Sequence, residues 1–373
     1  MSIASLLNGF GYVQGVHKTP DPDDNIAAIK FISEGTSTIS LAKIGEPPSV
    51  SLEYSNNGTD WSAWDLSGLT VNSGDTLYIR GNNPSGFSSS DSDYYTFVIK
   101  GDNVSCSGNI MTLIDYKNLP DTIPCDYCFY GLFENCNALT TAPELPAIEL
   151  TESCYDTMFS SCSSLTTAPK LPATKLADGC YYGMFSHCYS LTTAPELPAT
   201  ELAAGCYKNM FVKCSSLTSA PELPAMTLVA ACYSYMFSDC TSLTTAPELP
   251  AMTLANFCYQ AMFGGCTALT TAPELPATEL ATDCYENMFG GCTALTAAPE
   301  LPAMTLVINC YYAMFFGCTS LTTAPELPAM TLAERCYAYM FKNCTSLTSK
   351  PELPATELAT DCYLGMFDGT SLG

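Results

Sequence analysis

The chain has 373 residues, and its 13 basic and 37 acidic side chains give a formal net charge of −24. Because 47% of the residues are hydrophobic and only 13% are charged, the composition excludes a disordered chain and predicts a folded protein. So few Lys and Arg residues form no basic surface for a phosphate backbone, so we expect no nucleic-acid partner. The sequence lacks a long apolar stretch and a basic, apolar N-terminal leader. We therefore expect neither membrane insertion nor export by a signal peptide.

Residues 1–24 begin with an apolar stretch and end in TPDPDD. Such a composition is typical of a terminal arm followed by a linker. We expect this arm to dock onto a partner protein.

Residues 25–108 contain short alternating runs such as TISLAKI, TLYIRG and YYTFVIKG, separated by turn clusters such as NNGTD and NSGD. This pattern predicts a small all-β domain of the sandwich type. Trp61 and Trp64 follow the run VSLEYS, which carries Tyr54. Packing in the core or at its rim is the main interpretation of these two rings, and a sugar-stacking platform is the alternative, so both are candidates for a contact surface.

Residues 109–373 repeat a unit of 26 residues, of which ten copies are visible. One series of cysteines runs from Cys128 to Cys362 and a second from Cys136 to Cys344, both at this interval. A fixed period of this length predicts a solenoid, in which each unit buries its apolar side against the next and the array is one domain. Residues 113–126 fit the repeat only partly, as expected for a polar capping repeat.

Each unit has two halves. In one, Leu280, Cys284, Met288 and Cys292 lie four residues apart, which predicts a short helix with one apolar face. The other half, LTTAPELP, contains two prolines and predicts a short extended strand. The predicted fold class is therefore α/β: a leucine-rich-repeat-like solenoid of about ten 26-residue repeats, preceded by a small all-β sandwich.

The run MF..C.SLTTAPELPA..LA...CY..MF, spread over about residues 111–373, resembles the BspA-like type of leucine-rich repeat. The sequence departs from that type in its 26-residue period and in the extra proline of the strand. BspA-like repeats occur in surface proteins of gut bacteria and in similar phage virion proteins, where they serve adhesion and recognition. The resemblance implies a binding protein and supplies no catalytic residues.

The 21 cysteines are predicted to be reduced and mostly buried. On a helix, Cys284 and Cys292 would lie too far apart for a disulfide, and bonds between neighbouring units would break the equivalence of the copies. Buried thiols that act as small apolar side chains satisfy every copy alike. Zinc would need more histidines than His17 and His187, and the pair Cys125 and Cys128 is weak evidence for a metal. We expect no metal, no cofactor, and folding in a reducing cytoplasm.

No pattern of nucleophile and base is present, so we expect no enzyme activity. One acidic position recurs in almost every repeat, with Lys170 replacing it once. It is either a solvated edge of the sheet or an acidic ladder that binds cations or a basic partner. The ladder consists of Glu144, Glu196, Glu222, Glu248, Glu274, Glu300, Glu326 and Glu352.

One position of the CY..MF segment varies from copy to copy, for example Asp156, Ser234 and Ala338, and we expect it to face solvent. The leading hypothesis is a non-enzymatic recognition or adhesion protein, made in the host cytoplasm and displayed on a virion as a fibre or decoration protein that contacts the bacterial surface. The alternatives are a BspA-like bacterial cell-surface adhesin and a purely structural virion assembly component. Expected partners are proteins that bind the arm or the C-terminal edge of the solenoid, a cell-surface protein or glycan, and other copies of the chain.

Overall fold

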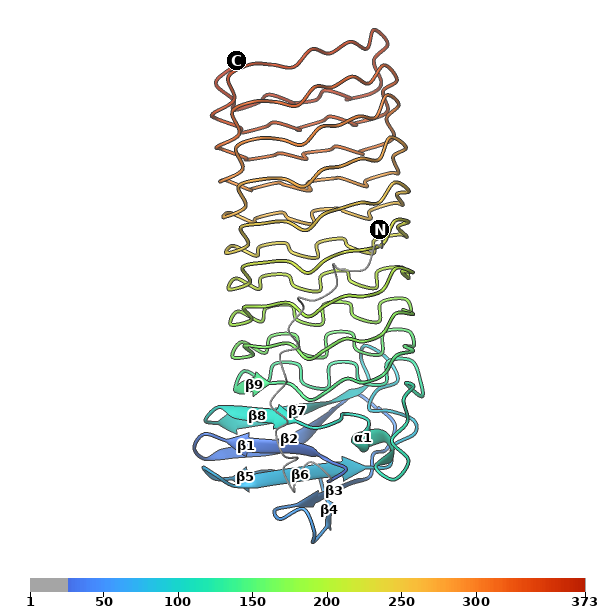
Figure 1. The fold of residues 1–373 in the computed structure, drawn as a ribbon, viewed down its shortest axis with the longest axis vertical. Helices are drawn as coiled ribbons and strands as arrows, with labels where there is room; N and C mark the ends of the chain where they lie inside the picture. The colour runs from blue at the N-terminus through green and yellow to red at the C-terminus, as the bar shows by residue number, and fades with distance from the viewer. Residues whose placement is uncertain (1–25, 373) are drawn as a thin grey trace, which may run out of the picture.

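The computed structural model describes residues 26–372, so the predicted arm, residues 1–24, lies outside the described part. Strands β1 to β8 form the base of the molecule, and the 26-residue repeats rise above them as a stack of coils (Figure 1). The strands of the base are Ile29–Ser33 (β1), Ser37–Ile44 (β2), Leu52–Ser55 (β3), Ser62–Trp64 (β4), Leu69–Val71 (β5), Thr76–Gly81 (β6), Tyr94–Gly101 (β7) and Val104–Ser107 (β8).

These strands form two sheets. One has the order β4-β3-β6-β1-β8-β9, where β9 is Leu139–Thr141 of the first repeat, and the other has the order β5-β2-β7. Side chains from both sheets meet in the core: the ring of Phe97 on β7 lies 5.4 Å from that of Phe31 on β1 and 6.3 Å from that of Trp64 on β4. The strand-rich character predicted for this segment is confirmed.

The base and the stack share one core. Strand β8 pairs with β9 in parallel, and the amides of Phe97 and Val104 donate to carbonyls of the first coil, those of Leu132 at 2.7 Å and Ala138 at 2.8 Å. One hydrophobic cluster runs without a break from β1 to Met366. The N-terminal sheets therefore cap the stack. Residues 113–126, predicted to be a polar capping repeat, do bridge in parallel to the repeats, from Thr122 to Glu149. They are not wholly polar, because helix α1 (Thr112–Asp115) overlaps their start and buries Leu113 and Ile114.

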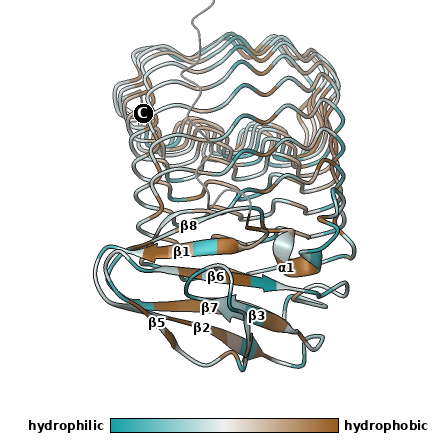
Figure 2. Ribbon diagram, turned by 60° about the horizontal axis from the view of Figure 1, so that its bottom comes forward, coloured by the Kyte–Doolittle hydropathy of each residue, from teal (hydrophilic) through white to brown (hydrophobic). Residues whose placement is uncertain are grey.

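Successive repeats lie parallel and in register at a spacing of 26 residues. Thr141 bridges to Thr167 and Thr167 to Thr193, and a second set of bridges joins Glu149, Lys175 and Glu201 in the same way. Viewed obliquely from the base, the coils overlie one another (Figure 2). The predicted 26-residue repeat and its extended segments are confirmed.

The predicted helix in each repeat is wrong, because α1 is the only α-helix of the described residues 26–372. The CY..MF segment is a chain of turns in which every fourth residue is left-handed, such as Asp283, Asn287 and Gly291 with φ of 56°, 51° and 77°. Backbone amides along this segment alternate between two kinds of partner. Some donate within the same coil, as the Met288 amide does to the Tyr285 carbonyl, and the others donate to the next coil, as the Tyr285 amide does to the Cys310 carbonyl. A four-residue turn period places side chains on one face just as a helix does, which explains the error.

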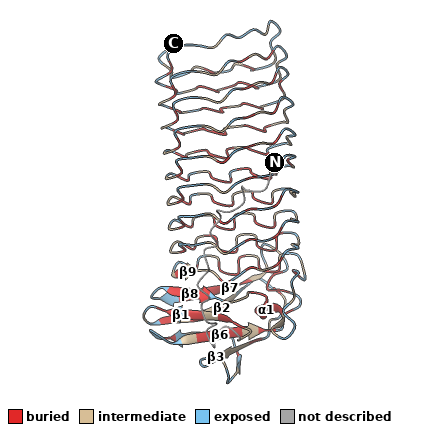
Figure 3. Ribbon diagram, viewed as in Figure 1, coloured by how far each residue is buried: buried red, intermediate tan, exposed pale blue. Residues whose placement is uncertain are grey.

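Aromatic rings and thiols fill the interior of the stack. Tyrosines from Tyr155 to Tyr363 and phenylalanines from Phe133 to Phe367 form two continuous ladders, in which neighbouring rings such as Tyr285 and Tyr311 lie 5.7 Å apart and nearly parallel. Each coil contributes buried residues at equivalent positions (Figure 3). The predicted burial of the thiols is confirmed for 20 of the 21 cysteines, because only Cys125 is partly exposed.

Candidate functional site

The predicted acidic ladder is exposed along the extended side of the stack. The eight glutamates occupy one equivalent position in eight coils, and Lys170 occupies it in another. All eight are exposed: Glu144, Glu196, Glu222, Glu248, Glu274, Glu300, Glu326 and Glu352. The parallel register of the coils therefore brings together carboxylates that are far apart in the sequence.

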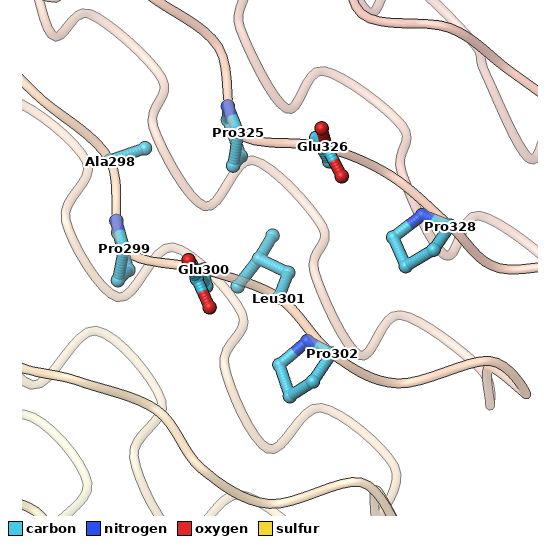
Figure 4. Close-up of a pocket in the computed structure, with 8 residues that line it drawn as sticks. All are labelled: Ala298, Pro299, Glu300, Leu301, Pro302, Pro325, Glu326 and Pro328. Carbon is cyan, nitrogen blue, oxygen red and sulfur yellow. The ribbon is translucent and has the colours of Figure 1, made fainter.

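Two rows of prolines flank the glutamates. In the close-up, Glu300 and Glu326 occupy equivalent places on neighbouring segments, with one proline before and one after each of them (Figure 4). The two segments border a shallow groove of about 220 Å³, which Leu301 also lines. Proline fixes φ and offers no amide donor, so this surface is stiff, and its charged groups are carboxylates that accept hydrogen bonds. Such a surface suits a ligand that brings hydrogen-bond donors or positive charge.

Uncompensated negative charge is the main electrostatic property of this face. In the part of the chain that the structure describes, none of the eight glutamates forms a salt bridge. At a strand-like spacing of about 5 Å, two unit charges repel by about 0.8 kcal/mol even in water. A basic or polyvalent cationic partner would relieve this repulsion on binding.

Sequence reasoning missed a row of exposed methionines on the same side of the stack. Met226, Met252, Met304 and Met330 are 50–54% exposed, and the Met252 and Met330 amides donate to the Met226 and Met304 carbonyls of the preceding coils. The equivalent residue is Thr in the ATEL repeats, as at Thr278. The signal was in the sequence, because the repeat types AMTL, AMTL and ATEL alternate from residue 200 onward with a longer period of 78 residues. Flexible, polarisable methionines suit adaptable apolar contacts.

The opposite, turn-built side carries the varying residues, and the expectation that they face solvent is only partly right. Ser234 and Ala338 are buried, and Leu364 is 43% exposed. The residues of this column contact one another from coil to coil: the Ser234 hydroxyl donates to Gln260, and the Gln260 amide donates to Glu286 at 2.7 Å. Packing between coils therefore restricts part of this variation.

The two tryptophans have different surroundings. Trp64 is only 6% exposed and donates a hydrogen bond from Nε1 to the Ser67 carbonyl. It therefore offers no ring face to a ligand, and its prediction as a contact residue is wrong. The guanidinium of Arg80 lies 3.6 Å from the ring centre of Trp61 and covers one of its faces.

No group of three or more His, Cys, Asp or Glu residues within 26–372 is arranged to hold a metal ion. Among these same residues, no helix has the length and apolarity to cross a bilayer. At the far end of the described stack, the residues around Tyr363 and Phe367 border a hollow of about 560 Å³, the surface at which partner contact was predicted.

Comparison with known protein families, with curated proteins and with solved structures finds no match to this chain.

Proposed function

We propose that the protein is a non-enzymatic recognition or adhesion protein whose stacked repeats present a long contact surface. The observation that carries this proposal is the row of eight exposed and unpaired glutamates along one side of the stack. One residue repeated in register gives many equivalent weak contacts, which add through effective concentration when the ligand is itself repetitive. The ligand class that fits is a polymer or surface that carries positive charge or hydrogen-bond donors.

The finer description of the fold belongs to the same proposal. We infer that the stacked coils are a solenoid of the leucine-rich-repeat kind, with a chain of turns in place of the helix. Parallel bridges at 26-residue intervals and the resemblance of the MF..C.SLTTAPELPA motif to BspA-like repeats support this inference. On that basis the carrier is a phage virion that displays the chain as a fibre or decoration protein, and the first alternative is a bacterial cell surface.

The contact surface is tested by replacing Glu222, Glu248, Glu274 and Glu300 with Gln. These residues are consecutive in the row, and Gln keeps the shape of the side chain while removing its charge. Binding of the purified chain to candidate host cells or to their isolated surface glycans is then measured. We expect the variant to bind at least about tenfold more weakly, because the lost contacts are multivalent.

The matched control replaces Met226, Met252, Met304 and Met330 with Thr. The chain itself carries Thr at the equivalent position in other repeats, as at Thr278, so the control should fold. Unchanged binding of the Gln variant would remove the glutamate row from the proposal, and a loss confined to the Thr variant would assign the contact to the methionines.

Immunogold imaging of virions and of fractionated cells distinguishes a virion protein from a protein of the bacterial cell envelope. Labelling of virions supports a fibre or decoration protein, whereas labelling of the cell envelope supports the adhesin. A chain that sits on virions, with no cell binding by wild type, would favour a structural assembly component.

A further inference from the structure

The pair Cys125 and Cys128 differs from every other thiol in the chain. Of the 21 cysteines, all of which lie within the described residues, Cys125 alone is partly exposed. The other thiols are buried, and those of the second series each donate a hydrogen bond to a phenylalanine carbonyl: Cys136 to Phe97 of β7, and the later members to the preceding coil, as Cys292 does to Phe263 at 3.1 Å. An oxidant in solution can therefore reach Cys125 without opening the core.

The surroundings of this pair are built by two parts of the molecule. Gly86, in the loop after β6, lies directly over it, because a Cβ atom there would sit 2.8 Å from the Cys125 Sγ and 3.0 Å from the Cys128 Cα. The Phe87 amide donates to the Cys128 carbonyl at 2.8 Å, and the Thr151 hydroxyl donates to the Cys125 carbonyl at 2.7 Å. The backbone on both sides of the pair is thus held in place.

The two cysteines lie close together. A Cβ atom on Gly86 would lie 2.8 Å from the Cys125 Sγ and 3.0 Å from the Cys128 Cα, so these two atoms are at most 5.8 Å apart. The neighbouring Cys128 thiol lowers the pKa of Cys125, while burial raises the pKa of Cys128. The arrangement gives one partly exposed nucleophile and one buried thiol three residues further along the chain.

We propose that Cys125 and Cys128 form a reversible disulfide, and that they are the only pair in the native protein to do so. The oxidant is a small-molecule disulfide such as oxidised glutathione. The Cys125 thiolate attacks one of its sulfurs, which forms a mixed disulfide and releases one glutathione thiolate. The Cys128 thiol then loses its proton to solvent or to the released thiolate and attacks the Cys125 sulfur, so the second glutathione leaves. The protein loses two hydrogen atoms, and the oxidised glutathione gains them as two reduced molecules.

This inference is independent of the adhesion proposal. It would place a redox-sensitive cross-link at the junction between the N-terminal sheets and the first coil, where Phe87 stacks on Phe129 at 6.0 Å between ring centres. The remaining thiols would stay reduced because each is buried.

The test is to incubate the folded full chain with oxidised glutathione, quench it with acid, unfold it, alkylate the free thiols and map them by mass spectrometry. We expect the loss of two of the 21 thiols, both within one Cys125–Cys128 disulfide that dithiothreitol reverses. A stable glutathione adduct on wild-type Cys125, a disulfide with Cys154, or no loss of thiols would each overturn the proposal.

Variants separate the two roles. Cys128→Ser should trap glutathione on Cys125, and Cys125→Ser should lose none of its remaining thiols. Cys362→Ser, at the far end of the same cysteine series, is the matched control and should oxidise as wild type does. If a variant fails to fold, labelling of native wild type with a maleimide gives the same information: Cys125 alone should react, and prior oxidation should abolish its reaction. Labelling of several cysteines, or of Cys125 after oxidation, would contradict the proposal.

Discussion

Phe97 of β7 stacks on Phe133 of the first coil, with ring centres 4.8 Å apart and an interplanar angle of 17°. Phe133 stacks in turn on Phe159 of the next coil, so a strand residue supplies the first ring of the phenylalanine ladder. The Phe97 carbonyl also accepts the Cys136 thiol at 3.1 Å, the same bond that the Phe133 carbonyl accepts from Cys162. The sheets therefore present to the first coil what a preceding coil would present, and this is how they cap the stack.

We predict that Phe97→Ala destabilises the protein by about 3–5 kcal/mol, the usual cost of removing a buried phenylalanine ring. Amide protection from hydrogen exchange should fall more in the first coil than in the others, because the first coil packs directly against the ring that is removed. Denaturant unfolding measures the free energy, and amide hydrogen exchange locates the change. Protection should fall at Phe133 and Asn135, whose amides bond to the second coil.

Phe263→Ala is the control for this prediction, because it removes an equivalent ring from the middle of the ladder. It should cost a similar free energy and lower protection around its own coil. A Phe97 variant whose loss of protection is no greater at the first coil than at the middle of the stack would contradict capping by the sheets.

Left-handed residues at every fourth position give a second prediction. Ala231 has φ of 53°, a conformation that costs an L-residue about 1–2 kcal/mol, whereas glycine adopts it freely. Ala231→Gly should therefore raise the free energy of unfolding by about 1 kcal/mol. Ala230→Gly is the matched control one residue away, where φ is not positive, and it should lower stability by about 0.5–1 kcal/mol. Equal effects of both substitutions would contradict the turn chain.

The repeats show how far the sequence predicts this fold and where it misleads. The period, the apolar face and the extended proline segment were predictable, because each depends on spacing that any stacked repeat must satisfy. The helix was not, since Leu280, Cys284, Met288 and Cys292 fit a four-residue turn as well as a helix. The distinguishing signal is the spacing of glycine, asparagine and aspartate, as in Asp283, Asn287 and Gly291, which tolerate left-handed φ.

The candidate surface was predictable for a similar reason. Glu274 and each of its equivalents except Glu352 precede a buried leucine by one residue, and in an extended segment neighbouring side chains point to opposite sides. Burial of Trp64 does not follow from the residue pattern of its own strand, because it depends on the packing of β4 against Phe97 of the other sheet. Contacts between sheets leave no simple periodic signal in the chain.

Asp156 gives a prediction for pH. Burial, with smaller contributions from the charges of Asp91 and Glu134, raises its pKa from 3.8 to about 7, and its Oδ1 is buried with no hydrogen-bond partner. Thr157 and Tyr130 are the other polar side chains at this cluster. The folded state holds the proton more tightly than the unfolded state, so the stabilising contribution is full below about pH 4 and is lost as pH rises towards 7.

Asp156→Asn should remove this dependence. Over pH 4 to 8, wild type should lose on the order of 4 kcal/mol relative to the variant, since one pKa unit corresponds to about 1.4 kcal/mol. The difference between the two unfolding curves is the quantity to measure, because the lowered pKa values of exposed Asp65, Asp93 and Asp115 act in the opposite direction in both proteins. Parallel curves for the two proteins would show that Asp156 is ionised in the folded state throughout this range.

The glutamate row gives the last prediction, which concerns stability and not binding. Replacing Glu222, Glu248, Glu274 and Glu300 with Gln removes repulsion between neighbours that amounts to about 0.8 kcal/mol per pair at a spacing of about 5 Å in water. The variant should therefore be more stable than wild type by a few kcal/mol at low ionic strength. In 1 M salt, where the screening length falls to about 3 Å, most of this gain should disappear. Thermal unfolding at the two salt concentrations measures it, with the four Met→Thr replacements as a control that leaves the charge unchanged. A gain of equal size at both salt concentrations would mean that the substitutions act through packing or hydrogen bonding. The glutamates would then not repel one another measurably, and a cationic partner would gain nothing by neutralising them.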